Sequence, residues 1–321
     1  MASRRRGGLL EIPGYLAVRA LILLARVLPR WALRLMGCGA GWLGHCLDRR
    51  HRQIAFEAVS RSFPEKTPDE HREIVRGCYR HIGLAAVEFA WLASARREDV
   101  LKLWALDDEQ IALVDGIRAE RPAPIFVTGH VGLWELCGLG YSARGWPVAS
   151  IARPLDNPRI NMVIDGVRER FGQRILAKRG ALVAALHALK EGTPVAMLLD
   201  QNAGKLGCFV PLFGRLASTL STAAEMALRT GSPIVCVSSW RDEAAGVHRL
   251  RLGRILRPKR WTGPRDDHYR AEVLRLTAEY TRNIEEAVRE HPEQWLWLHR
   301  RWKTRPPEEE AQDPGNLSKT Q

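Results

Sequence analysis

The sequence has 321 residues, a hydrophobic content of 45%, a net charge of +13 at pH 7 and an isoelectric point near 10.0. This composition is that of a folded protein and not of a disordered one, and the excess of positive charge favours an anionic partner: a membrane, an acidic protein or a nucleic acid. The six cysteines form no Cys-x-x-Cys pair and no zinc-finger spacing, so we expect free thiols. Without a His-Glu-x-x-His motif or a glycine-rich phosphate loop, the sequence predicts no metal and no nucleotide cofactor.

Positive charge is concentrated in residues 1–52, which hold ten arginines and two acidic residues. An apolar run covers residues 12–28, but Arg19 and Arg26 interrupt it, and each is costly at the centre of a bilayer. Helical spacing puts four arginines on one stripe and three leucines on the opposite face: Arg19, Arg26, Arg30 and Arg34 against Leu21, Leu24 and Leu28. We expect basic amphipathic helices, divided at Pro29, that lie on an anionic membrane surface. A signal peptide, or a soluble helix packed on the core, is the alternative.

Residues 53–120 are expected to be helical, in segments 53–62, 68–93 and 98–120, with Thr67 as the N-cap of the second. From residue 124 short apolar runs typical of strands alternate with segments of helical periodicity. Strands are predicted at 124–128, 147–152, 174–177, 194–199 and 233–240, with an edge strand at 248–256, and helices at 131–143, 158–171, 180–191, 218–230 and 266–290. This predicts an α/β fold whose central sheet, mainly parallel or mixed, is flanked by helices. We divide the chain into membrane-anchoring helices (1–52), a catalytic domain (53–305, helical over 53–120 and α/β over 121–305) and a disordered acidic tail (306–321).

The segment Ile125–Gly140 contains the strongest candidate for catalysis. His130 follows a short apolar strand at the sheet edge where open α/β folds bind ligands, and Glu135 lies five residues later. With His130 in the turn before the helix, Glu135 can point back, fix the imidazole tautomer and leave the other ring nitrogen as a general base. A surface histidine beside a solvated glutamate is the alternative.

Three further polar residues follow predicted strands. Arg153, held extended by the proline after it, suits the binding of an oxyanion or a phosphate. Asp200 and Gln201 end the most apolar strand, where an acid needs a partner, and a salt bridge from Asp200 to Arg153 is one possibility.

The remaining candidates concern apolar surface. Phe209, Leu212 and Phe213 lie in a glycine-rich stretch that we expect to be a flexible loop forming the wall of an apolar channel, although such residues are more often core. The segment 295–303 interleaves tryptophans with basic residues, which fits a single-strand nucleic-acid binder, a membrane-facing rim, or a structural helix with its tryptophans in the core.

Five blocks in order resemble the bacterial lipid A late acyltransferases (lauroyl and myristoyl transferases), within the lysophospholipid acyltransferase superfamily. They are His130-x4-Glu135, Arg153-Pro154 with Asn157-Pro158, Leu199-Asp200-Gln201, Val210-Pro211-Leu212-Phe213-Gly214, and His291-Pro292-Glu293-Gln294-Trp295 through His299-Arg300-Arg301-Trp302-Lys303. The resemblance runs from the basic N-terminus to about residue 305. The chain departs from the family pattern at Leu212, where phenylalanine is usual, and around Trp295–Trp297, where the first aromatic is usually tyrosine.

The resemblance implies a glycerolipid-acyltransferase-like fold and direct acyl transfer, without an acyl-enzyme. His130 would deprotonate an acceptor hydroxyl, Glu135 would orient the imidazole, and Arg153 with backbone N–H groups near residues 131–133 would stabilise the oxyanion. The implied donor is acyl carrier protein or acyl-CoA, and the acceptor a lipid A precursor, another glycolipid or a lysophospholipid. The expected place is the cytoplasmic face of the inner membrane. A non-catalytic protein that binds membranes or nucleic acid is the competing class, although no nucleic-acid partner is expected.

Overall fold

The N-terminal quarter of the protein is helical and packs on one long helix. The computed structural model describes residues 11–152, 154–176 and 180–307. Its first helices are α1 (Ile12–Val27), α2 (Arg30–Leu47), α3 (Arg49–Ser62) and α4 (Pro68–Leu92). As predicted, α1 and α2 are separated at Pro29, and Thr67 caps α4 in a reciprocal capping box with Glu70.

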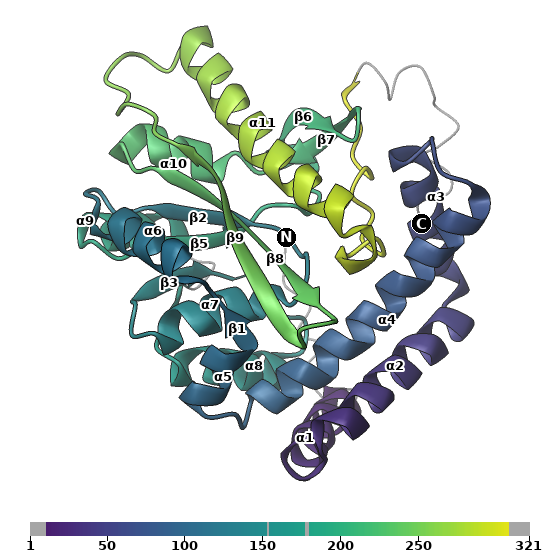
Figure 1. Cartoon of the computed structure of the whole chain (residues 1–321). Coiled ribbons are helices and arrows are strands. Elements are labelled where there is room, and N and C mark those ends of the chain that lie inside the picture. Colours follow the sequence, from purple (N-terminus) through teal and green to yellow (C-terminus); the bar gives the residue numbers. More distant parts are fainter. Residues whose placement is uncertain (1–10, 153, 177–179, 308–321) are drawn as a thin grey trace.

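Helices α2 and α4 run side by side along one flank of the molecule (Figure 1). Glycines make this close approach possible, because a Cβ atom at Gly83 would lie 2.2 Å from the carbonyl oxygen of Gly37. Ala25 of α1 and Leu33 of α2 are buried against Ala90 of α4. The N-terminal helices are therefore packed on the fold, while much of their apolar surface stays exposed. Within the described ranges, no helix is both long enough and apolar enough to cross a bilayer.

Among the described residues, a seven-stranded mixed sheet in the order β1-β9-β8-β2-β5-β3-β4 forms the centre of the α/β part. Strands β8, β2, β5, β3 and β4 are parallel, whereas β9 is antiparallel to β8, which confirms the predicted fold class. The strands are β1 (Trp104–Ala105), β2 (Ile125–Thr128), β3 (Val148–Ile151), β4 (Gln173–Leu176), β5 (Val195–Leu198), β8 (Ile234–Asp242) and β9 (Val247–Leu256).

Alternating side chains of the sheet serve two separate cores. Ile125 and Val127 face a core shared with α9 (Ala181–Lys190), α10 (Thr222–Thr230) and α11 (Asp267–Glu290). Phe126, between them, faces the other core, which is shared with α4, α5 (Arg97–Leu103), α6 (Asp108–Ala119), α7 (Trp134–Ala143) and α8 (Pro158–Arg170). This period-2 division is expected for strands covered by helices on both faces.

Three expectations about secondary structure are wrong. Residues 98–120 are not one helix, because β1 interrupts them to pair with β9. For the same reason β9 is an interior strand and not an edge. Residues 208–219 form a hairpin, β6 (Cys208–Leu212) and β7 (Arg215–Thr219), which is separate from the main sheet. Gly204, Gly207 and Gly214 indicated a flexible loop, but Gly214 lies in the turn of this hairpin and the strands on either side of it are regular. Most of the predicted acidic tail, 308–321, lies outside the described residues.

Candidate active site

His130 and Asp200 meet at the carboxyl edge of the sheet. Strands β2 and β5 are parallel neighbours with Thr128 opposite Leu198, and each candidate residue follows its strand by two positions. Equivalent positions on adjacent parallel strands lie side by side, so the two side chains come together. Gly129 permits this approach, because a Cβ atom there would lie 3.1 Å from the Asp200 carboxylate.

The carboxylate of Asp200 accepts three hydrogen bonds. His130 donates from its ring Nδ1 to Oδ1 and from its backbone N–H to Oδ2, both at 2.7 Å. The indole Nε1 of Trp295 donates to Oδ2 at 2.8 Å. With Nδ1–H held by the carboxylate, Nε2 of His130 carries the lone pair and accepts a long hydrogen bond of 3.5 Å from the side-chain amide of Gln201.

The two groups stabilise each other's charged forms. Burial acts to lower the pKa of His130, but the charge and hydrogen bond of Asp200, followed by the charge of Glu135, raise it above its ordinary value of 6.5. Burial acts to raise the pKa of Asp200, but His130 and the Trp295 indole outweigh it and hold this pKa below its usual range. The arrangement therefore suits a base whose protonated form is stabilised.

Glu135 does not contact the imidazole, and the expectation that it orients His130 by a hydrogen bond is wrong. The helix begins at Trp134, so Glu135 lies in the first turn of α7 and points toward α8. Arg168 donates two hydrogen bonds, of 2.6 and 3.0 Å, to the carboxylate of Glu135, and a third, of 2.9 Å, to Asp165. Glu135 acts on His130 through its charge alone.

The turn after His130 is held from three sides. His81 of α4 donates from Nε2 to the carbonyl oxygen of Gly132 at 3.1 Å, and the N–H of Gly132 donates to the carbonyl of Gln294 at 3.0 Å. Gly132 has a φ of +59°, and a Cβ atom there would lie 2.5 Å from the carbonyl oxygen of Ser239 on β8. Only glycine fits this conformation and this contact.

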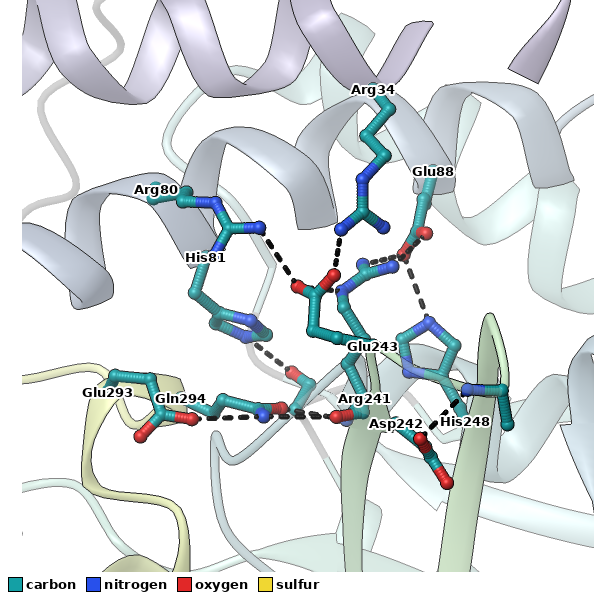
Figure 2. A network of polar contacts seen from close by, with 12 residues as sticks. Arg34, Arg80, His81, Glu88, Arg241, Asp242, Glu243, His248, Glu293 and Gln294 are labelled. Carbon is teal, nitrogen blue, oxygen red and sulfur yellow. Dashed lines mark hydrogen bonds and ion pairs between the residues drawn. The ribbon is translucent and has the colours of Figure 1, made fainter. Parts of the chain in front are cut away.

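A buried ionic network joins the same region to the N-terminal helices (Figure 2). Glu88 of α4 forms an ion pair with Arg241 of β8 and accepts a hydrogen bond from Nε2 of His248 on β9 at 3.0 Å. Gln294 bonds the backbone of Arg241 through both its amide oxygen and its amide nitrogen. At the rim, Glu243 pairs with arginines of α2 and α4. The network connects α4 to the segment that carries Trp295.

His130 and Glu135 open onto a cavity of about 570 Å³. The cavity extends between the sheet face that carries Phe126 and the helices α7 and α8. Its lining away from His130 is mainly apolar and includes Trp104, Val148, Ile164, Val237, Leu250 and Leu252. A polar mouth with an apolar interior is the shape required by a ligand with a reactive head and a hydrocarbon tail.

Some sequence candidates lie elsewhere. Phe209, Leu212 and Phe213 do not line this cavity, so the proposed channel wall is wrong. Phe209 is half-buried in β6, whereas Leu212 and Phe213 are buried in the core, where Phe213 packs among aromatic rings. Arg153 lies outside the described residues, so its pairing with Asp200 is not described. Cys137 lines the cavity, but burial raises the pKa of its thiol to about 11.

Sequence reasoning missed two partners. Trp295, which binds Asp200, and Trp297 and Trp302 are buried at 3%, 1% and 9% exposure, which excludes a membrane-facing rim. The tryptophans lie in the core as the structural alternative expects, but residues 295–303 form turns and not a helix. Arg168 lies on a predicted helix, but no local pattern linked it to Glu135. Within the described ranges, no three His, Cys, Asp or Glu side chains gather closely enough to hold a metal ion.

The chain is similar in sequence to known acyltransferases. The family model described as "Bacterial lipid A biosynthesis acyltransferase" matches residues 8–304. The chain is 28% identical to the lipid A biosynthesis lauroyltransferase of Escherichia coli K12 over 285 residues, which is 87% of this chain and 88% of the relative. It is 27% identical to the palmitoleoyltransferase of the same organism, covering 87% of each chain. Among solved structures, the 1-acyl-sn-glycerophosphate acyltransferase PlsC of Thermotoga maritima matches with a TM-score of 0.35 and 16% identity, over 80% of this chain and 98% of that one.

Proposed function

The chain belongs to the family of bacterial lipid A biosynthesis acyltransferases, and from this membership we propose that it moves a fatty acyl chain from a thioester donor to a hydroxyl of a lipid A precursor. The observation that carries the proposal is the His130–Asp200 pair at the mouth of an apolar cavity. The donor is acyl carrier protein, an acidic partner suited to a chain of net charge +13, or acyl-CoA.

The proposed reaction proceeds in two proton-balanced steps. Nε2 of His130 takes the proton of the acceptor hydroxyl while the oxygen attacks the thioester carbonyl, and Asp200 stabilises the imidazolium. The tetrahedral intermediate then collapses, the carbon–sulfur bond breaks, and the imidazolium returns its proton to the thiolate. The acyl tail occupies the apolar interior of the cavity throughout. Charge on Glu135 strengthens His130 as a base, and Arg168 keeps that carboxylate in place.

The test is acyl transfer by purified His130→Gln. We expect its turnover to fall by about 10²–10⁴-fold, the usual contribution of a general base. His187→Gln, an exposed histidine on α9, is the matched control and should keep normal activity. Supplying a lipid A precursor, a second glycolipid and a lysophospholipid in parallel identifies the acceptor. Near-normal turnover by His130→Gln would contradict the mechanism.

We further propose that α1 and α2 hold the protein on the cytoplasmic face of the inner membrane. Large apolar side chains are exposed along these helices, including Val27 at 77%, Trp31 at 67% and Trp42 at 65%. Tryptophans beside arginines are typical of helices that lie in the headgroup region.

Vesicle flotation tests this anchoring. Trp31→Ser/Trp42→Ser should lower recovery with vesicles that contain phosphatidylglycerol, whereas the control Leu113→Ser/Leu274→Ser, at exposed positions of α6 and α11, should not. If both double variants floated with the vesicles as well as the natural protein does, the membrane contact would lie elsewhere.

A further inference from the structure

A second hollow, of about 510 Å³, lies between α1 and α8 on the surface of the protein. Four arginines line it together with apolar side chains: Arg19 and Arg26 of α1, and Arg159 and Arg170 of α8. The start of α1 is tied to α8 by a hydrogen bond of 2.9 Å from the Asn157 side chain to the carbonyl of Glu11. We call this hollow the arginine groove.

Helix α8 separates the arginine groove from the catalytic cavity. Asn161, Ile164 and Arg168 line the cavity, whereas Arg159, Val163 and Arg170 line the groove. At about 100° per residue these sets fall on opposite faces of the helix. A ligand in the groove is therefore kept apart from His130 by the thickness of a helix.

The positive charge of the groove is not neutralised by the described residues. Arg19, Arg26 and Arg159 form no side-chain ion pair or hydrogen bond within those ranges. Arg170 donates to the carbonyls of Leu92 and Ala95, which are uncharged. Burial, followed by the positive charge of Arg26, lowers the pKa of Arg170. Like charges gathered without a carboxylate favour the binding of an anion.

Apolar side chains border the groove on α1. Leu23 lines it and is 55% exposed, and Leu16 and Val27, each one position beyond the groove-lining Tyr15 and Arg26, are 56% and 77% exposed. On α8, Met162 lines the groove and is 74% exposed. The groove thus combines guanidinium donors with a hydrocarbon rim that continues onto the exposed face of α1.

We propose that the arginine groove binds the headgroup phosphate of an anionic membrane phospholipid that is not itself acylated. Guanidinium groups bind phosphate oxygens in pairs of parallel hydrogen bonds, and the apolar rim receives the beginning of the acyl chains. The proposal rests on the membrane association proposed above. It adds a specific lipid site on the far side of α8 from the chemistry.

Two other anionic occupants fit the groove less well. The phosphate of the acceptor would have to remain here while its hydroxyl reached His130 on the opposite face of α8. An acidic carrier protein would meet a concave hollow edged by exposed Leu23 and Met162, whereas such a partner calls for a broad polar rim. Both occupants predict kinetic effects that a bound phospholipid does not.

Calorimetric titration of the full chain with monomeric dihexanoyl phosphatidylglycerol tests the site without any membrane. Arg26→Gln/Arg159→Gln should bind this lipid about tenfold more weakly or worse, because two charge-assisted contacts are lost. Arg26→Lys/Arg159→Lys should recover part of the affinity, since charge returns without the planar fork. Arg49→Gln/Arg50→Gln, exposed on α3, removes equal charge and should bind like the natural protein.

The outcomes separate this proposal from its rivals. Weak binding of dihexanoyl phosphatidylcholine and of inorganic phosphate supports a site for an anionic lipid, and equal binding of inorganic phosphate overturns it. Unchanged lipid affinity in Arg26→Gln/Arg159→Gln, or an equal loss in the α3 control, also overturns it. If Arg26→Gln/Arg159→Gln raised the KM for the acceptor or the donor and left lipid binding unchanged, the groove would be assigned to that substrate and the proposal overturned. Because the titration needs neither turnover nor vesicles, it can fail while acyl transfer and membrane binding stand.

Discussion

The His130–Asp200 pair and the His248–Glu88 pair have similar geometry, yet the pKa values of the two histidines are shifted in opposite directions. Each places a ring nitrogen within 3.0 Å of a carboxylate oxygen, and each histidine is largely buried. The pKa of His130 is raised, whereas burial lowers the pKa of His248 despite its bond to Glu88. Burial is the largest cause at both histidines and is deeper at His248, whose side chain is 1% exposed against 17% for His130. At His248 the positive charges of Arg241 and Arg30 add to the effect of burial, so the bond to Glu88 does not outweigh it.

A carboxylate beside a histidine therefore does not by itself make a base. Asp200 receives its other bonds from a backbone N–H and an indole, which are neutral, so no second cation is hydrogen-bonded to it in competition with His130. Glu88 has a permanent cation and uses His248 as a neutral donor. In the first pair His130 lines the cavity and is the proposed base, whereas the second pair joins α4 to β8 and β9 (Figure 2).

The largest effect on activity is expected from Asp200→Asn. The amide keeps the shape of the side chain but cannot stabilise the imidazolium, so we expect turnover to fall by about 10²–10⁴-fold. The acyl-transfer assay, with circular dichroism as the check on folding, measures this loss. Comparable activity in Asp200→Asn and the natural protein would show that the two pairs do not differ in function.

Glu88→Gln should have the opposite effect to Asp200→Asn: it should lower the stability of the fold and leave turnover largely unchanged. Arg241 would lose its counter-charge, and the amide nitrogen would place a donor where Arg241 or His248 now donates to an oxygen. Removing one partner of a buried ion pair costs on the order of 3 kcal/mol or more. Urea unfolding measures the change in free energy, while the folded fraction should retain most of its turnover. A fall in turnover that exceeds the fall in folded fraction would mean that the network also positions the catalytic turn.

The pH dependence of kcat/KM offers a smaller and more specific test. His130 must be neutral to accept a proton, so activity is lost as pH falls through its pKa, which lies above 6.5. Removing the charge of Glu135 with Glu135→Gln should move this limb to lower pH, because that charge raises the pKa. Glu285→Gln on α11, a carboxylate that binds the backbone of Phe213, is the control and should leave the limb in place.

Cys137→Ala should have the smallest effect. The thiol lines the cavity, yet burial raises its pKa to about 11, so it is not ionised near neutral pH. We expect turnover within about twofold of normal and no acyl adduct in the intact-protein mass after incubation with donor alone. An adduct of one acyl chain that disappears in Cys137→Ala would indicate a thioester intermediate, with His130 acting as base for the thiol.

Local sequence was sufficient for most of the elements and for the position of the candidate base. The short apolar runs predicted β2, β3, β4, β5 and β8 within a residue or two, and Thr67 with Pro68 predicted the start of α4. These signals are local because capping and periodicity depend on residues a few positions apart. The same patterns placed His130 and Asp200 at strand ends, on the correct edge of the sheet.

The tertiary structure alone decided which carboxylate meets His130. Glu135 is near in sequence, but α7 begins at Trp134 and turns that side chain to Arg168, whereas strand order places Asp200 beside the imidazole. Strand order depends on contacts between segments some 70 residues apart, which no local spacing encodes. The cavity at His130 and the arginine groove share this origin, because each is formed where elements distant in the chain pack together.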